Sequence, residues 1–253
     1  MLPSSKLCTV RLNGDLMQLR WFLSIGLLLS LSLALCPAQA GAELAIRVGL
    51  TRSFRGTRQI TATASSRYSI LKTGSSQKLA TFEAGTPATI QLDGSQLSIS
   101  TASGTPIPAG TSVTIVPGDP ASTIDIEPPG LPNKRYRGKI EISVQPTGML
   151  VINVLDIEDY LPGVLVGEMP SSFPEEALKS QAVAARCYTL CARNKHATAG
   201  FNLCDGSHCQ VYDGCLRETP KLVSAVSATK GQILNYKGKI ASIMYHGDSG
   251  GIT

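Results

Sequence analysis

Short alternating runs dominate the first half of the chain, and they predict β-strands. From Leu44 to about Val144, apolar and polar residues alternate with a period of two, and β-branched residues are frequent. The clearest runs are ELAIRVGL, RYSILK, ATIQL, QLSIS, TSVTIV and GKIEISV. Glycine, serine, threonine and proline fill the gaps between them, as is typical of turns. The pattern therefore predicts hairpins in a sheet or barrel.

Helical patterning begins only after a proline-rich stretch, which reads IEPPGLPNKRYRG. Proline and glycine at this density indicate a boundary, and we expect it near Pro128 to Pro132. The helical segments then follow, beginning with DIEDYLPGVLV. The expected fold class is α+β, with a β-rich accessory region at 41–130 and a mixed α/β domain at 131–253.

An alanine-rich segment predicts a long second helix with basic residues along one side. Ser172, with Glu175 three residues later, fits a capping box at its start. Lys179, Arg186 and Arg193 are spaced seven apart, so they lie nearly on one line along the helix. The stripe is either a solvated charged face or one side of a groove.

A single carboxylate, Glu168, lies in an apolar run just before this helix, in VLVGEMP. An acid in such surroundings is suited to general-acid chemistry, although a buried structural glutamate is the commoner case. Most enzymes that cleave sugar polymers need a second carboxylate, for which Asp156, Glu158 and Asp159 are candidates. A mechanism with one acid is also possible if a hydroxyl of the sugar itself attacks.

Composition and charge narrow the possible partners only slightly. The chain has 253 residues, a net charge of +5 and a pI of about 8.8. This basic balance is too weak to indicate nucleic acid, and we expect no nucleic-acid partner. It suits an anionic polymer such as a cell wall, or it serves solubility alone.

The N-terminus has the order of charges and apolar residues found in an export signal. Arg20 precedes the apolar run WFLSIGLLLSLSLALC, which is about as long as a signal-peptide core and short for a spanning helix. The sequence Ala38-Gln39-Ala40 then provides an A-x-A cleavage site. We expect a signal peptide at 1–40 and a mature protein in the cell envelope, the periplasm or outside the cell. An uncleaved anchor is the alternative.

Cysteine and histidine gather in one short stretch, HATAGFNLCDGSHC. His196, Cys204, His208 and Cys209 offer two nitrogen and two sulfur ligands, a set that suits tetrahedral zinc. In an exported chain a Cys204–Cys209 disulfide is a serious rival. In either case we expect a structural role, in which the cluster holds the loop that follows it.

Three longer segments carry a resemblance to a known family. They are NVLDIEDYLPGVLVGEMPSSFPEEALKSQAVAARCYTL, HATAGFNLCDGSHCQVYDG and AVSATKGQILNYKGKIASIMYHGDSGGIT. In this order and spacing they resemble the SpoIID/LytB family, which comprises sporulation stage II D proteins and amidase-enhancer relatives. The resemblance covers about residues 135 to 253. Family members continue beyond the SGG motif, so we expect the domain to be incomplete at its C-terminal end.

The resemblance implies a peptidoglycan lytic transglycosylase that cleaves bonds between N-acetylmuramic acid and N-acetylglucosamine. Glu168, in the EMP motif, would be its single acid and base, and no cofactor would be needed for the chemistry. The basic residues implicated in activity correspond to Lys179 and Arg186. The expected substrate-binding residues are Lys179, Arg186, Gln210, Tyr212, Ser249, Gly250 and Gly251. At the cysteine and histidine cluster, some family members hold zinc and others a disulfide.

The same resemblance leaves an alternative without catalysis. Its amidase-enhancer side implies a cell-wall binding protein, or an activator of an N-acetylmuramoyl-L-alanine amidase. The expected partners are therefore peptidoglycan glycan strands and a cell-wall amidase. A structural exported β-protein is a third possibility.

Overall fold

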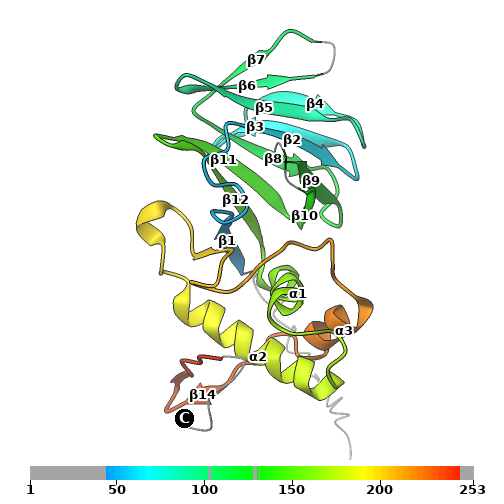
Figure 1. Cartoon of the computed structure of the whole chain (residues 1–253), viewed down its shortest axis with the longest axis vertical. Helices are drawn as coiled ribbons and strands as arrows, with labels where there is room; N and C mark the ends of the chain where they lie inside the picture. The colour runs from blue at the N-terminus through cyan, green and yellow to red at the C-terminus, as the bar shows by residue number, and fades with distance from the viewer. Residues whose placement is uncertain (1–43, 102–103, 128–129, 131, 246–253) are drawn as a thin grey trace, which may run out of the picture. The chain divides into compact units, whose positions relative to one another are not determined.

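The computed structural model describes residues 44–101, 104–127, 130 and 132–245. The expected signal peptide and the site residues Ser249, Gly250 and Gly251 lie outside this part of the chain. Within it, the chain forms fifteen β-strands and three α-helices. The prediction of an α+β fold with a β-rich first half is confirmed (Figure 1).

The larger sheet has seven strands, and it joins segments from both ends of the described chain. In spatial order they are β13 (Leu203–Cys204), β1 (Ala45–Gly49), β12 (Gly148–Asp156), β11 (Lys139–Gln145), β8 (Ser112–Pro117), β3 (Tyr68–Lys72) and β4 (Lys78–Phe82). All neighbours are antiparallel except β13, which runs parallel to β1. The sheet therefore contains strands from both sides of the boundary expected near residue 130, and the division into two domains stays a prediction.

The second sheet has six antiparallel strands. In order they are β10 (Lys134–Arg137), β9 (Thr123–Glu127), β2 (Gln59–Ala64), β5 (Ala88–Asp93), β6 (Gln96–Ser100) and β7 (Ile107–Gly110). A separate short hairpin is formed by β14 (Asn235–Tyr236) and β15 (Lys239–Ile240). Every second residue of β2 is buried, as its alternating sequence predicts. Buried residues of both sheets belong to one hydrophobic cluster.

Three helices pack against one another below the two large sheets in the view of Figure 1. They are α1 (Ile157–Glu168), α2 (Glu175–Ala192) and α3 (Pro220–Ala228), and a short 3-10 helix η1 (Ala197–Ala199) follows α2. α1 follows β12 directly. Its N-cap is Asp156, whose Oδ1 accepts a hydrogen bond from the backbone N–H of Glu158 at 2.8 Å. No helix in the described ranges is both long and apolar enough to cross a membrane.

The start of α2 differs from the expected capping box. The helix begins at Glu175 with Pro174 as its N-cap, and no side chain caps it. The carbonyl of Pro174 accepts the first backbone bonds, from Ala177 and Leu178 at 3.1 and 3.2 Å. Ser172 lies two residues before the N-cap, outside the reach of the box, so that prediction was wrong.

Candidate functional site

At the end of helix α1, Glu168 contacts the loop that follows the cysteine and histidine cluster. Glu168 is the last residue of α1 and is partly exposed. Its Oε1 accepts a hydrogen bond from the backbone N–H of Val211 at 2.7 Å. The backbone of the loop therefore fixes one oxygen, and among the described residues Oε2 has no donor.

Two glycines on one face of α1 let this loop approach closely. A Cβ at Gly163 would lie 2.6 Å from Cε2 of Tyr212, and one at Gly167 would lie 2.6 Å from the carbonyl oxygen of Val211. Both glycines lie four residues apart, so they face the same side of the helix. This small-residue face sets the depth at which α1 packs, and with it the contact between Glu168 and Val211.

Gln210 is fully buried and ties the helices to the chain around it. Its Oε1 accepts hydrogen bonds from Tyr160 Oη at 3.3 Å and from Thr189 Oγ1 at 2.8 Å. Its Nε2 donates to the carbonyl oxygen of Ala185 at 3.3 Å and to Tyr245 Oη at 2.8 Å. These four bonds use the full hydrogen-bonding capacity of the amide. Gln210 is therefore part of the protein interior next to Glu168 and Val211. Its expected contact with a glycan stays a prediction.

Tyr212 is also in the interior. It is 1% exposed, and its hydroxyl donates to Oδ1 of Asn153 at 2.8 Å. Burial raises the pKa of Tyr212 well above its usual value. The side chain thus supports the loop from the interior of the protein, and its expected role in substrate binding stays a prediction.

The three basic residues of the α2 stripe have different surroundings. Lys179 is 26% exposed and pairs with Glu175 and Glu176 at 2.8 and 2.9 Å, and these partners raise its pKa. Arg186 is buried, whereas Arg193 is exposed. A solvated charged face is therefore wrong for Arg186, because neighbouring segments cover this part of the helix.

Arg186 is only 2% exposed and pairs with a carboxylate on the neighbouring helix. Its Nε and Nη2 donate to Oε1 and Oε2 of Glu158 at 2.9 and 2.7 Å, and Nη1 donates to the carbonyl oxygen of Gln232 at 3.1 Å. The fork of the guanidinium matches the carboxylate with two parallel bonds. The sequence marks both residues as charged, but it gives no sign that they form a pair.

The other acids considered as partners of Glu168 lie at the opposite end of α1. Asp156 caps the helix, while Glu158 and Asp159 are in its first turn. Ten residues separate Glu158 from Glu168, which is about 15 Å along a helix axis. Carboxylate pairs that act on one glycosidic bond are closer, at most about 9.5 Å apart. None of the three acids is placed to act together with Glu168 on one bond.

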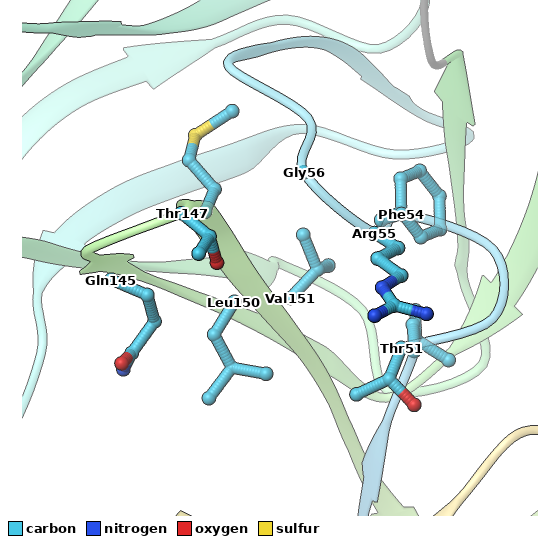
Figure 2. Close-up of a pocket in the computed structure, with 10 residues that line it drawn as sticks. Thr51, Phe54, Arg55, Gly56, Gln145, Thr147, Leu150 and Val151 are labelled. Atoms are coloured by element: carbon cyan, nitrogen blue, oxygen red, sulfur yellow. The ribbon is translucent and has the colours of Figure 1, made fainter.

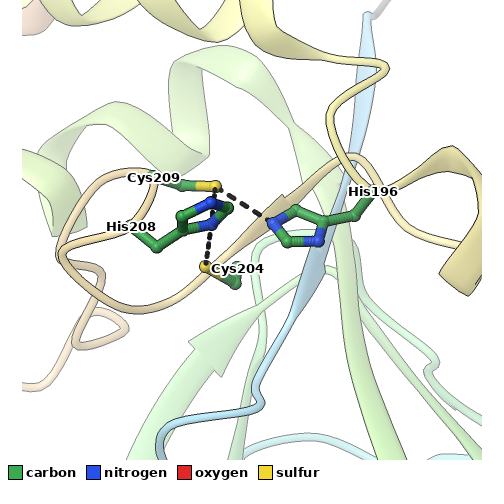
Figure 3. A group of neighbouring side chains, drawn as sticks. All are labelled: His196, Cys204, His208 and Cys209. Carbon is green, nitrogen blue, oxygen red and sulfur yellow. Dashed lines mark hydrogen bonds between the residues drawn. The ribbon is translucent and has the colours of Figure 1, made fainter.

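The predicted metal ligands come together, as Figure 3 shows. His196 follows α2, Cys204 lies in β13, and His208 and Cys209 lie in the next loop. Cys209 Sγ is 3.3 Å from His196 Nε2 and 3.7 Å from His208 Nδ1, and Cys204 Sγ is 3.8 Å from His208 Nδ1. All four ligand atoms lie within 4.8 Å of one another.

The three sulfur–nitrogen distances of 3.3–3.8 Å match those of a tetrahedral zinc site. With zinc–sulfur bonds of about 2.3 Å and zinc–nitrogen bonds of about 2.0 Å, ligand atoms at tetrahedral corners lie about 3.3–3.8 Å apart. The two sulfurs belong to buried residues, and both cysteines are free thiols in this structure. Burial raises the pKa of Cys209 to about 11 and lowers the pKa of His196. A bound cation would offset the cost of the buried thiolate, so the donor set is chemically suited to zinc.

A buried carboxylate that the sequence analysis missed connects this cluster to the strands. Asp205 is fully buried, and it accepts hydrogen bonds from the backbone N–H groups of Arg52 and Ser53 at 2.7 and 3.1 Å. The hydroxyl of Ser53 donates to it as well, at 2.7 Å. The one available signal was its position directly after Cys204 in CDGSHC. Asp205 fixes the loop of the cluster to the segment that follows β1.

One pocket lies beside that segment, but it contains none of the predicted site residues. Figure 2 shows it, with a volume of about 370 Å³ between residues 50–56 and 145–151. Phe54, Leu150 and Val151 supply apolar walls, and Arg55 supplies one charge. The chemistry predicted for Glu168 has no connection with this pocket.

Comparison with known proteins agrees with the part of the chain that builds the site. Residues 145–236 match the SpoIID family, described as stage II sporulation protein. This part of the chain belongs to the SpoIID family. The match includes Glu168, Arg186 and the four predicted metal ligands, so the resemblance recognised in the sequence is confirmed.

Three relatives show how far the similarity extends. An uncharacterised protein of Brachyspira hyodysenteriae is 38% identical over 119 residues, which are 47% of this chain and 32% of that protein. The amidase enhancer of Bacillus subtilis is 38% identical over 93 residues, 37% of this chain and 12% of its own length. Stage II sporulation protein D of B. subtilis is 33% identical over 129 residues, 45% and 38% of the two chains. In each case the match covers less than half of the relative.

Proposed function

We propose that this SpoIID protein is a peptidoglycan lytic transglycosylase with Glu168 as its acid and base. The observation that carries the proposal is the position of this carboxylate at the end of α1. Val211 fixes Oε1 at 2.7 Å, and among the described residues none occupies Oε2. A carboxyl group held at one oxygen and open at the other can transfer a proton without changing its orientation.

The reaction needs only this one group. Protonated Glu168 donates its proton to the glycosidic oxygen, and the bond from that oxygen to C1 of N-acetylmuramic acid breaks. The carboxylate then takes the proton of the 6-hydroxyl of the same sugar as O6 bonds to C1. The products are a 1,6-anhydromuramic acid end and an N-acetylglucosamine with a free 4-hydroxyl. Water is not consumed.

The distance of the other acids favours this route over hydrolysis. Hydrolytic glycosidases place a second carboxylate within about 5–9.5 Å, to attack the sugar or to activate water. Glu158 lies about 15 Å from Glu168 along the helix, and its carboxylate is occupied by Arg186. An intramolecular hydroxyl needs no such partner.

We also propose that His196, Cys204, His208 and Cys209 hold one zinc ion with a structural role. A zinc ion bound there would cross-link the segment after α2 with β13 and the loop of Cys209. That loop leads within two residues to Val211, the donor to Glu168. The four residues thus support the position of the proposed acid without contacting the substrate.

A second candidate function follows from one relative. The B. subtilis protein that is 38% identical over 93 residues is named amidase enhancer. In this alternative the chain binds the cell wall, or activates an N-acetylmuramoyl-L-alanine amidase, and Glu168 has no chemical role. For both candidates we propose that the protein is exported to the cell envelope and meets peptidoglycan there.

The test is mass spectrometry of glycan strands stripped of stem peptides, after incubation with the protein. A lytic transglycosylase produces fragments with 1,6-anhydro ends, and the Glu168→Gln variant does not. Reducing muramic acid ends would mean that water attacked, which contradicts the mechanism. Uncut glycan together with faster peptide release by an added cell-wall amidase would favour the activator.

A further inference from the structure

We propose that Glu158 is a positioning residue for Glu168, and that Arg186 acts through Glu158 without contacting the glycan. The inference rests on the proposed function and deepens it, because it concerns the geometry of the same site. It differs from the expectation drawn from the sequence, in which Arg186 lines the substrate groove.

The burial of Arg186 is the first argument. The residue is 2% exposed, and three of its five N–H donors are engaged by Glu158 and Gln232. A sugar could reach the guanidinium only if these bonds broke and the covering segments moved. By contrast, Lys179 on the same helix is 26% exposed and could reach a ligand by exchanging its partners.

The second argument is the set of segments that the ion pair joins. Glu158 lies in the first turn of α1, Arg186 lies in the middle of α2, and Gln232 follows α3. The backbone N–H of Gly231 adds a further bond to Oε1 of Glu158 at 3.2 Å. The pair therefore fixes the beginning of α1 relative to the other two helical segments.

The third argument is the position of Glu168 at the other end of the same helix. A helix of twelve residues is about 18 Å long. α1 contains Pro162, which removes one backbone hydrogen bond, but the residues around it are buried and hold the middle of the helix in place. We expect a shift at its first turn to reach its last turn. At that last turn, Gly167 and Glu168 meet Val211 with a close backbone approach and a bond of 2.7 Å. Misplacement by about 1 Å in an active site can cost about a hundredfold in rate.

The test compares Glu158→Gln with a matched control elsewhere in the protein. The control is Glu141→Gln, which removes a similar two-bond pair with Arg47 between strands β11 and β1. We expect Glu158→Gln to lower kcat on stripped glycan about tenfold to a hundredfold, with KM within about twofold. The products keep their 1,6-anhydro ends, because Glu168 is intact. We expect Glu141→Gln to behave as the wild type.

The amide resonance of Val211 in a ¹⁵N–¹H NMR spectrum provides a readout that does not depend on activity. We expect this resonance to shift in Glu158→Gln and in Glu168→Gln, and to stay in place in Glu141→Gln. If the wild type cleaves no glycan, the proposed function fails. The Val211 resonance then decides the positioning role alone, and an unchanged resonance in Glu158→Gln overturns it.

A double variant distinguishes a loss of positioning from a loss of the fold. Removing one partner leaves a buried charge unpaired, whereas replacing both with apolar residues of similar size is often tolerated. In Glu158→Met/Arg186→Met we expect a folded protein whose kcat is no lower than that of either single variant. If Arg186→Met raises KM while Glu158→Met cleaves as the wild type does, Arg186 contacts the glycan and the inference is wrong.

Discussion

The strands and the site bury different kinds of residues. In the sheets the buried set is almost wholly apolar, and it includes the isoleucines at 60, 70, 90, 99, 115, 124, 126, 140 and 142. Around the helices and the loop after β13, the interior also holds Arg186, Thr189, Asp205 and Gln210. Apolar burial depends on area and shape, whereas each buried polar group depends on particular partners. The strands should therefore respond to substitution through stability, and the site through geometry and activity.

Removal of metal from the four-residue cluster should have the largest effect. If zinc is bound, a strong chelator should release about one ion per chain and cost several kcal/mol, since structural zinc contributes directly to folding. For a domain of this size the melting temperature should then fall by about 10 °C. Calorimetry combined with metal analysis measures both. Cys191→Ser is the control, because this exposed cysteine lies outside the cluster. Oxidised Cys204 and Cys209 with no metal released would instead favour the disulfide.

A truncation in the strands should affect stability alone. Ile90 is fully buried in β5 and pairs with Ile60 and Ile99 on the neighbouring strands. Ile90→Ala should lower the free energy of unfolding by about 3 kcal/mol, through lost burial and the cavity left behind. The neighbouring Gln91 is exposed, so Gln91→Ala should change it by about 0.5 kcal/mol or less. Urea unfolding measures both values. Activity per folded molecule should be unchanged. A loss of activity would contradict the expectation that the strands affect stability alone.

The opposite response is expected at Glu168. Glu168→Gln keeps the shape and an oxygen for the N–H of Val211 but removes the acid, so turnover should fall about a hundredfold or more. That corresponds to about 2.7 kcal/mol in the barrier. The melting temperature should stay within a few degrees of that of the wild type. Asp159→Asn serves as the control and should retain 1,6-anhydro products. Full activity of Glu168→Gln would refute the mechanism.

The sequence predicts the strands better than it predicts the surroundings of Glu168. Alternation identifies strands because the two faces of a strand have different environments. It does not identify their partners, and β1 pairs with β12 more than 100 residues later along the chain. The spacing on α2 predicts the side of the helix on which Arg186 lies. It does not predict which segment covers this side, because that depends on tertiary packing. Glu158 looks like any acid in a first turn, and only the structure reveals its pair with Arg186.

The close packing of α1 can be tested at Gly163. Alanine at a helix interior is favoured over glycine by about 1 kcal/mol. Here, however, a Cβ would lie 2.6 Å from the ring of Tyr212 and 2.7 Å from the carbonyl oxygen of Gly214. We expect Gly163→Ala to destabilise the protein by about 1–2 kcal/mol, because overpacking outweighs propensity. In the control Gly206→Ala the nearest atom is 3.9 Å away, so little change is expected. Equal unfolding curves for both variants would contradict this packing.

A smaller and pH-dependent effect on stability is expected at Asp213, where the loop after the cysteine and histidine cluster meets Arg52 and Lys134. Asp213 accepts a hydrogen bond from Lys134 at 3.1 Å and pairs with Arg52 and Arg217. Burial alone raises the pKa of Asp213, but Lys134 and Arg52 outweigh it and lower the pKa below its usual value. The folded state therefore holds the carboxylate ionised at a lower pH than the unfolded chain does. The resulting stability is present above the unfolded pKa of about 3.9 and is lost as pH falls through the folded value.

Asp213→Asn should thus lower the free energy of unfolding by about 1 kcal/mol at pH 7, a modest value because the cations are partly exposed to solvent and salt. The difference from the wild type should shrink as pH falls below about 4, and urea titrations from pH 7 to pH 2.5 would measure it. Glu83→Gln is the control, since its pair with Arg67 is 73% and 68% exposed and should contribute little at any pH. A difference at Asp213 that stayed constant down to pH 2.5 would mean that packing of the side chain, and not its charge, stabilises this junction.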